Sequence, residues 1–480
     1  MLNLEPKQLW QCFYEICQVP RPSKKEEQII DFLMNWGKKH GIDTVKDHAG
    51  NVLMRKPATK GYEKRPTVVL QAHMDMVCEK NSDVNHDFLK DPIQTYIDGE
   101  WLKAKGTTLG ADNGIGMAAM MAVMLDEEAK HPALECLFTV DEETGLTGAF
   151  ELKKGFLSGN RLLNLDSEDD GEIFIGCAGG VDTLINLPYT EEEAPKDLYY
   201  CKVTLKGLCG GHSGDDIEKG RANANKLMNR FLWSVNKKRN IRISEINGGN
   251  LRNAIPRESY CVFGVPEKFR DTLSAMLNQY LSDVQAEYAV TEPNLQMDLE
   301  TVKTPKTVIS KVATKKLLNS VYACPNGVIR MSDDMPGLVE TSTNLASVKM
   351  KDGKNIEIVT SQRSSVESAK KDIAMMVESV FVLAGAKVSH SDGYPGWKPN
   401  PKSEVAQVIS SSYNRLFGKS PKVKAIHAGL ECGLFSKKYP KMDMASFGPT
   451  MRGVHSPDER LHIKDTEKFY HLLLDVLENM

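Results

Sequence analysis

The chain has 480 residues, of which 41 % are hydrophobic and 26 % are charged, a composition typical of a soluble globular protein of about three folding units and too apolar for a disordered one. Its 61 Lys and Arg nearly balance 64 Asp and Glu, and the net charge of −3 indicates neither a nucleic-acid nor a membrane-surface partner. The apolar runs are far shorter than the roughly 20 residues of a membrane-spanning helix, so no span is predicted.

The cellular location follows from the first residues and from the cysteines. The opening segment, MLNLEPKQLWQCFYEI, lacks the basic and then uninterrupted apolar stretch of a signal peptide. The ten Cys form no C-x-x-C pair and no regular spacing, a pattern typical of reduced, mostly buried thiols rather than a disulfide framework. These features predict a cytosolic protein.

The first 186 residues alternate between helical and strand periodicities. Amphipathic helices are expected at 6–17 and 24–40, and a Met- and Ala-rich buried helix at 116–127. A short strand is expected at 51–55, and apolar runs predict buried strands at 67–72, 133–140 and 161–165, with a helical stretch at 149–154. This order predicts an α/β fold with a mostly parallel, doubly wound sheet.

The pattern changes between an acidic segment, TEEEAPKD at 190–197, and a turn-rich one, YPGWKPNP at 394–401. The residues between them predict two successive β-α-β-β-α units. Their strands are expected at 198–205, 241–245, 260–265, 296–302, 343–350 and 355–360, and their helices at 221–235, 268–286, 308–322 and 366–383. The α/β pattern then resumes with helices at 404–416 and 465–477 and strands at 423–428 and 444–447. We therefore expect a discontinuous α/β domain, 1–189 and 396–480, with an α+β lid domain, 190–395, inserted in it.

Polar residues concentrate at the carboxyl ends of the predicted core strands, where open α/β sheets bind their ligands. His73 and Asp75, in TVVLQAHMDM, project to the same face of an extended chain, so the carboxylate can orient the imidazole. Asp112, in TTLGADNGIGMAAM, lies in a glycine-rich loop before a helix. The alternatives are a solvated strand end for the first pair and a helix cap for Asp112, and a phosphate loop is disfavoured because the G-K-[ST] ending is missing.

Further carboxylates and a second histidine follow later strands. Glu142 and Glu143, after Asp141 in ECLFTVDEETGLTGA, repel one another unless a cation or proton compensates them, although a solvated loop is also possible. Asp166 ends another buried strand, in RLLNLDSEDDGEIF, and His455 lies in a loop after the last one. Two imidazoles with three carboxylates suit a pair of Zn²⁺ ions, and a spare glutamate suits a general base.

Taken in order, these motifs resemble the di-zinc metallopeptidase superfamily of aminoacylases, carboxypeptidases and dipeptidases, and within it the aminoacyl-histidine (Xaa-His, carnosinase-like) dipeptidases. The resemblance covers nearly the whole chain through QVPRPSKKEEQI, HMDMV, GADNGIG, DEETGLTGA, NLDSED, GGHSGDDIEKGRANA, HAGLECGLF and GVHSPDER. It implies two Zn²⁺ per chain, replaceable by Co²⁺ or Mn²⁺, a water that bridges them, and a cis peptide bond between Asp112 and Asn113.

The resemblance also implies a role for each candidate residue. The metal ligands would be His73 and Asp166 on one ion, Glu143 and His455 on the other, and Asp112 on both. Asp75 would orient His73, and Glu142 would be the general base. In the lid, His212 in GGHSGDD would support the oxyanion, and Asn253 and Arg363 would hold the substrate carboxylate. Gly429 and Glu431, in HAGLECG, would line the substrate pocket.

The sequence therefore predicts a cytosolic zinc dipeptidase that hydrolyses unblocked dipeptides and favours Xaa-His substrates. Two alternatives on this scaffold are a broad-specificity dipeptidase and an aminoacylase. An alternative of another class is a non-catalytic peptide-binding protein, which would have no need of Glu142. The expected partner is a small peptide, with no nucleic acid or membrane, and a homodimer is possible.

Overall fold

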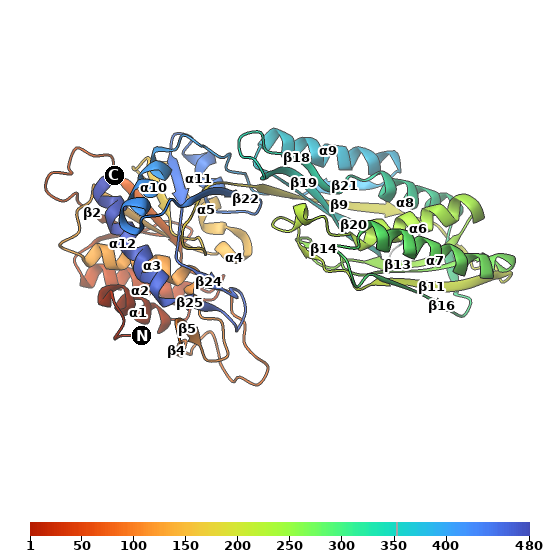
Figure 1. The fold of residues 1–480 in the computed structure, drawn as a ribbon, viewed down its shortest axis with the longest axis horizontal. Coiled ribbons are helices and arrows are strands. Elements are labelled where there is room, and N and C mark those ends of the chain that lie inside the picture. Colours follow the sequence, from red (N-terminus) through yellow and green to blue (C-terminus); the bar gives the residue numbers. More distant parts are fainter. Residues whose placement is uncertain (352–353) are drawn as a thin grey trace. The chain divides into compact units, whose positions relative to one another are not determined.

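The structure, a computed structural model, describes residues 1–351 and 354–480, which divide into two compact units (Figure 1). The first unit comprises Met1–Cys177, Trp397–Ala425 and Leu430–Met480, and the second comprises Ala178–Gly396 with Ile426–Gly429. We refer to the second as the inserted unit. In the described parts of the chain, no helix has the length and apolarity that crossing a membrane would require.

The first unit is built around an eight-stranded sheet in the order β1-β2-β6-β3-β7-β23-β8-β22. The central strands β6, β3, β7 and β23 are parallel, whereas β1–β2, β2–β6 and β23–β8 are antiparallel pairs. The α/β class is thus confirmed, and the four central strands are parallel to one another. The strands are β1 (Asp43–Lys46), β2 (Val52–Lys56), β3 (Val68–His73), β6 (Leu134–Thr139), β7 (Arg161–Asn164), β8 (Glu172–Cys177), β22 (Lys422–Ile426) and β23 (Asp443–Ser446).

Every residue of β3 and β6 is buried, as expected for strands whose two faces are both covered. The α3 helix, rich in Ala and Met, is buried along almost its whole length and packs against β3. A second, four-stranded sheet in the order β24-β25-β5-β4 anchors the loop that contains His455. The remaining elements are α1 (Lys7–Cys17), α2 (Glu27–Lys39), α3 (Ala111–Leu125), α4 (Glu142–Gly145), α5 (Thr147–Glu151), α10 (Glu404–Phe417), α11 (Cys432–Lys438), α12 (Ile463–Asn479), β4 (Thr95–Asp98), β5 (Trp101–Ala104), β24 (Met451–Arg452) and β25 (Arg460–His462).

The inserted unit contains one nine-stranded sheet in the order β16-β11-β15-β13-β19-β20-β9-β21, with β18 paired to β19. The two predicted β-α-β-β-α units share this sheet and join where β13 pairs with β19. The first strand of the second predicted unit, β16, pairs with β11 of the first unit. The strands are β9 (Gly179–Pro188), β11 (Leu198–Lys206), β13 (Arg242–Gly248), β15 (Ser259–Pro266), β16 (Gln296–Thr301), β18 (Gly327–Met331), β19 (Val339–Lys351), β20 (Asn355–Ser364) and β21 (Lys387–His390).

Four helices lie along this sheet and enclose a core that includes Phe231, Phe263 and Phe381 (Figure 1). They are α6 (Ala224–Arg239), α7 (Arg270–Glu287), α8 (Lys311–Ala323) and α9 (Glu367–Leu383). Short helical turns, η1 (Ile217–Lys219) and η2 (Glu267–Phe269), complete the unit. Two small ribbons pair β10 (Glu191–Glu193) with β17 (Thr307–Ile309) and β12 (Gly211–His212) with β14 (Ala254–Ile255). The acidic segment 190–197 is therefore not merely a connection, because β10 lies within it.

Candidate active site

Five of the predicted site residues converge in the first unit, at the carboxyl ends of its central strands. His73 is the last residue of β3, Asp166 follows β7 by two residues, and Glu143 lies in the turn after β6. Asp112 is the second residue of α3, and His455 lies on the connection between β24 and β25. Because β3, β6 and β7 are parallel, their carboxyl ends lie at one edge of the sheet.

Asp112 lies between the two histidines. Its Oδ1 is 3.0 Å from Nε2 of His73, and its Oδ2 is 3.1 Å from Nε2 of His455. His73 Nε2 is also 3.4 Å from Asp166 Oδ1, and His455 Nε2 is 3.0 Å from Glu143 Oε1. Two groups of three donors thus share one carboxylate, and within each group the donor atoms lie within 4.8 Å of one another.

The backbone at this carboxylate departs from a regular helix. Asp112 and Asn113 have non-helical dihedral angles inside α3, and the peptide bond between them is cis. The cis bond implied by the resemblance is therefore confirmed. The side chain of Asn113 donates a hydrogen bond to Asp166 and accepts one from the N–H of Gly116 (3.1 Å). Asn113 thereby fixes the loop of one predicted ligand against the side chain of another.

Burial and neighbouring charges shift the pKa values of this cluster. Burial raises the pKa of Glu142 well above its ordinary value, that of Asp166 to about 6, and that of Glu168 to about 8, and neighbouring carboxylates add to each rise. Hydrogen bonds to Asp112 and Glu143 raise the pKa of His455 to about 11. Such a concentration of carboxylates around two imidazoles is an environment that divalent cations neutralise.

Asp75 contacts His73, the turn that carries the two glutamates, and Ser23. Its Oδ1 lies 3.3 Å from His73 Nδ1, and its carboxylate accepts hydrogen bonds from the N–H groups of Glu142 (3.0 Å) and Glu143 (3.2 Å) and from the hydroxyl of Ser23 (2.7 Å). Asp75 is fully buried. It therefore fixes both the imidazole and the turn on which the two glutamates lie.

The model of Peptidase family M20/M25/M40 matches residues 69–479, a range that includes all the residues of both donor groups. The chain belongs to this peptidase family. The peptidase is thus an enzyme of a metallopeptidase family and a hydrolase.

Individual relatives agree with this assignment. The peptidase is 47 % identical over 478 residues to the cytosol non-specific dipeptidase of Escherichia coli (strain K12), covering 100 % of this chain and 98 % of the relative. The crystal structure of aminoacylhistidine dipeptidase from Vibrio alginolyticus matches with a TM-score of 0.93 at 45 % identity, covering 100 % and 98 % of the two chains. The predicted resemblance to this group is confirmed. Aminopeptidase PepT from Bacillus cereus, at 16 % identity and a TM-score of 0.62 over 99 % and 98 % of the chains, shares the fold.

The inserted unit of the peptidase gathers other predicted residues into a second cluster. Arg363, on β20, lies with Nη2 3.4 Å from His212 Nε2 and donates from Nη1 to the hydroxyl of Tyr394 (2.9 Å). His212 Nδ1 lies 3.1 Å from Asp215 Oδ2. The pairing of β12 with β14 places His212 opposite Ala254, next to the exposed Asn253 in the chain.

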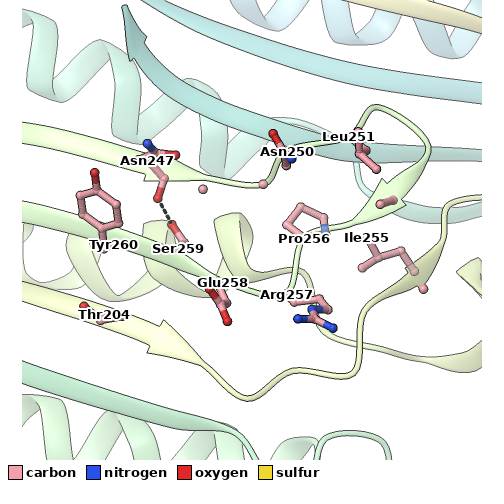
Figure 2. Close-up of a pocket in the computed structure, with 14 residues that line it drawn as sticks. Thr204, Asn247, Asn250, Leu251, Ile255, Pro256, Arg257, Glu258, Ser259 and Tyr260 are labelled. Atoms are coloured by element: carbon pink, nitrogen blue, oxygen red, sulfur yellow. Dashed lines mark hydrogen bonds between the residues drawn. The ribbon is translucent and has the colours of Figure 1, made fainter. Parts of the chain in front are cut away.

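A pocket of about 400 Å³ adjoins this ribbon in the inserted unit. Figure 2 shows its lining, which includes Leu251, Ile255, Pro256 and Arg257, and the Ser259 hydroxyl donates to the carbonyl of Asn247 (3.3 Å). Open space therefore lies beside the loop that carries Asn253.

The HAGLECG segment is divided between the units. Gly429 belongs to the inserted unit, where a Cβ atom at its position would lie 2.7 Å from the ring of Tyr394. Glu431 belongs to the first unit, where its Oε2 accepts hydrogen bonds from Gln71 Nε2 (2.6 Å) and the Thr139 hydroxyl (2.8 Å). Glu431 is fully buried, and burial raises its pKa to about 8. The two predicted pocket residues thus lie in different surroundings.

Protonation of His427 is expected to destabilise the peptidase. Its Nε2 lies 2.7 Å from the Ser342 hydroxyl, the residue is 6 % exposed, and burial, followed by the charge of Arg363, lowers its pKa from 6.5 to about 4. The free energy of unfolding keeps its full value above pH ~6.5, where the imidazole is neutral in the folded and the unfolded protein. It decreases by up to about 3 kcal/mol as the pH falls toward about 4. The free energy of unfolding of His427→Gln, measured in urea across this range, should depend less steeply on pH. An unchanged slope would contradict this assignment.

Several residues around these clusters were not singled out from the sequence. Arg21 lies in QVPRPSKKEEQI and Glu459 in GVHSPDER, two of the motifs that carry the resemblance, but nothing in their spacing indicates their contacts. Glu168 follows Asp166 by two residues, a spacing that could have associated it with the carboxylate cluster. Tyr394 lies in a segment interpreted only as a turn.

Proposed function

We propose that this peptidase is a zinc-dependent dipeptidase that hydrolyses unblocked dipeptides and favours those with a C-terminal histidine. The observation that carries the proposal is the position of Asp112, with one carboxylate oxygen against each of two histidines. The Xaa-His preference is supported by the Vibrio relative, which is named an aminoacylhistidine dipeptidase. A cytoplasmic location is supported by the Escherichia coli relative, which is named a cytosol dipeptidase.

The donor set fits two Zn²⁺ ions per chain. Neutral imidazole nitrogens and carboxylate oxygens are ordinary zinc ligands, and Co²⁺ or Mn²⁺ can replace zinc at such sites. We assign His73 and Asp166 to one ion, Glu143 and His455 to the other, and Asp112 to both. When bound, the ions would polarise the scissile carbonyl and lower the pKa of a water toward ~7.

Glu142 is the proposed general base. Its carboxylate would take a proton from the water whose oxygen attacks the carbonyl carbon, and would pass that proton to the amine that leaves when the C–N bond breaks. A raised pKa suits a group that must both accept and return a proton near neutral pH. Asp75 would keep His73 oriented and hold the backbone of Glu142.

The inserted unit would supply the contacts that recognise a short substrate. We assign the developing oxyanion to His212, and the substrate carboxylate to Arg363 and Asn253. We also assign Gly429 and Glu431 to the lining of the substrate pocket. Arg363 is suited to a carboxylate because the residue is buried and its guanidinium is already held by Tyr394. A substrate site that binds both ends of the peptide selects dipeptides by their length.

Replacing Arg363 with alanine is expected to raise KM more than it lowers kcat, because the lost contact holds the unreacting end of the substrate. Amidating the C-terminus of the dipeptide should weaken binding to the wild-type protein by about 10-fold or more, a loss typical of a charged hydrogen bond, yet change little in Arg363→Ala. Arg230→Ala, at an arginine on α6 paired with Glu287, is the matched control and should behave as wild type. Equal turnover of free and amidated dipeptides by the wild-type protein would rule out the carboxylate contact.

A broad-specificity dipeptidase is the second candidate, because the Escherichia coli relative is named a non-specific dipeptidase. A panel of β-Ala-His, Gly-Leu and an N-acetyl amino acid, assayed after zinc is stripped and then restored, separates the candidates. Preference for β-Ala-His supports the proposal, and equal turnover of both dipeptides supports broad specificity. Turnover of the acetylated substrate indicates an aminoacylase, and binding without turnover indicates a peptide-binding protein. A homodimer stays a prediction.

A further inference from the structure

The carboxylate of Glu459 binds the backbone N–H groups of the residues that lead to Asp112. Glu459 accepts hydrogen bonds at Oε2 from the N–H groups of Leu109 (2.7 Å) and Gly110 (2.9 Å), and at Oε1 from those of Ala111 (2.8 Å) and Asp112 (3.4 Å). Glu459 is 2 % exposed. Because the first N–H groups of a helix have no acceptor within it, Glu459 satisfies the donors at the start of α3.

Arg21 binds the same loop through a hydrogen bond to a backbone carbonyl group. Its Nη2 donates to the carbonyl of Gly110, and its Nη1 donates to the carbonyls of Met74 (3.1 Å) and Asp75 (2.9 Å). Arg21 is also 2 % exposed. A Cβ atom at Gly110, where φ is +66°, would lie 2.6 Å from Nη2, so glycine permits this close approach. The guanidinium therefore ties the loop of Asp112 to the end of β3.

Glu459 also belongs to the segment that carries His455. The two residues are four apart on the connection between β24 and β25. The segment is internally bonded, with Glu459 N–H donating to the carbonyl of Ser456 (3.0 Å) and the Ser456 hydroxyl donating to the carbonyl of Gly453 (2.6 Å). One short segment thus supplies both a predicted ligand and the carboxylate that fixes the loop of the shared ligand.

We propose that Glu459 and Arg21 are positioning residues that fix Asp112 and His455 relative to one another. They thereby set the affinity of the site for metal, and they couple binding at its two cation positions. The proposal rests on the two-ion site proposed above. Removing either side chain would leave the buried backbone groups that it binds unpaired, so the loop would no longer be held. Losing residues that orient metal ligands typically weakens metal binding by about 10–100-fold.

Glu135 provides a matched control within the same unit. It is 3 % exposed and accepts hydrogen bonds from the N–H groups of Ser158 (2.9 Å) and Gly159 (3.0 Å), so it too is a buried carboxylate that fixes a loop. It lies at the amino end of β6, whereas the donor cluster lies at the carboxyl ends of the strands. A variant at this position therefore reports the stability cost of losing such a carboxylate without touching the site.

The experiment measures Zn²⁺ binding to metal-free Glu459→Gln, Glu135→Gln and wild-type protein in competition with a chromophoric chelator, and the melting temperature of each metal-free protein. Both variants should melt below wild type, but only Glu459→Gln should bind zinc about 10–100-fold more weakly, with the two ions no longer binding together. Its Co²⁺ absorption spectrum should also change. Arg21→Lys, which retains the positive charge but cannot span three carbonyls, should weaken zinc binding in the same direction, and it decides the question if Glu459→Gln does not fold.

The outcomes separate this inference from the proposed function. If wild-type protein binds no zinc, the two-ion site itself is wrong. If wild-type protein binds two ions and Glu459→Gln binds them with the same affinity, the positioning role is wrong and the site stands. Equal weakening in Glu135→Gln would show a general effect of stability and would overturn the positioning role as well.

Discussion

Alanine at position 142 is expected to leave two zinc ions bound while lowering kcat by at least ~10²-fold, the contribution typical of a general base. The expectation depends on the division of labour between adjacent glutamates, Glu142 as base and Glu143 as ligand. The structure makes this a sharp test, because His73, Glu142 and Glu143 also bring one donor atom each within 4.8 Å of one another. Metal content measured by elemental analysis, beside steady-state kinetics, gives the answer.

Glu142→Gln and Glu143→Gln are the matched pair for this test, because each changes one carboxylate to an amide of nearly the same shape. Glu142→Gln should retain metal without turnover, and Glu143→Gln should lose metal. An empty site in Glu142→Ala would mean that the base and the ligand are exchanged between these two positions.

Alanine at position 112 is expected to remove both zinc binding and hydrolysis. Asp112 is the carboxylate that the two donor groups share, so its loss deletes one ligand from each ion. Because a ligand that binds only the folded state stabilises it, added Zn²⁺ should raise the melting temperature of wild-type protein but not that of Asp112→Ala. Calorimetry with and without Zn²⁺ measures this difference.

The control is Asp126→Ala, which removes an aspartate at the other end of α3 that accepts hydrogen bonds from the N–H groups of Glu128 (2.9 Å) and Ala129 (3.0 Å). This variant should keep its response to zinc even if it is less stable. Full zinc binding by Asp112→Ala would refute the shared-ligand assignment.

The cluster in the first unit could be predicted because short sequence patterns determine its position. Continuous apolar runs mark β3, β6 and β7 as buried strands, and parallel strands place the residues that follow them at one edge. His73 and Asp166 therefore needed no knowledge of distant contacts. The start of α3 was predicted five residues too late, at Gly116, because the glycine-rich residues before it show no helical periodicity.

Contacts between distant segments could not be predicted in this way. Nothing local in β16 indicates that it pairs with β11, or in β8 that it adds antiparallel to a parallel sheet. The bonds of Glu459 to the loop at Gly110 join residues 349 positions apart, and periodicity carries no information at that range. The sequence therefore predicted the residues that gather at this edge of the sheet, with Asp75 beside His73, but not the distant side chains of Arg21 and Glu459 that bind the loop of Asp112.

The division of HAGLECG between the units has a consequence for how this architecture can be recombined. Residues 426–429 belong to the inserted unit, where the N–H of Ala178 lies 3.1 Å from the carbonyl of Ile426 and 3.0 Å from that of Ala428. A gene fusion that transplants only 178–396 onto another scaffold would leave this four-residue piece, with His427, behind. The inserted unit is therefore a module of two fragments, and chimaeras between relatives should exchange both fragments together.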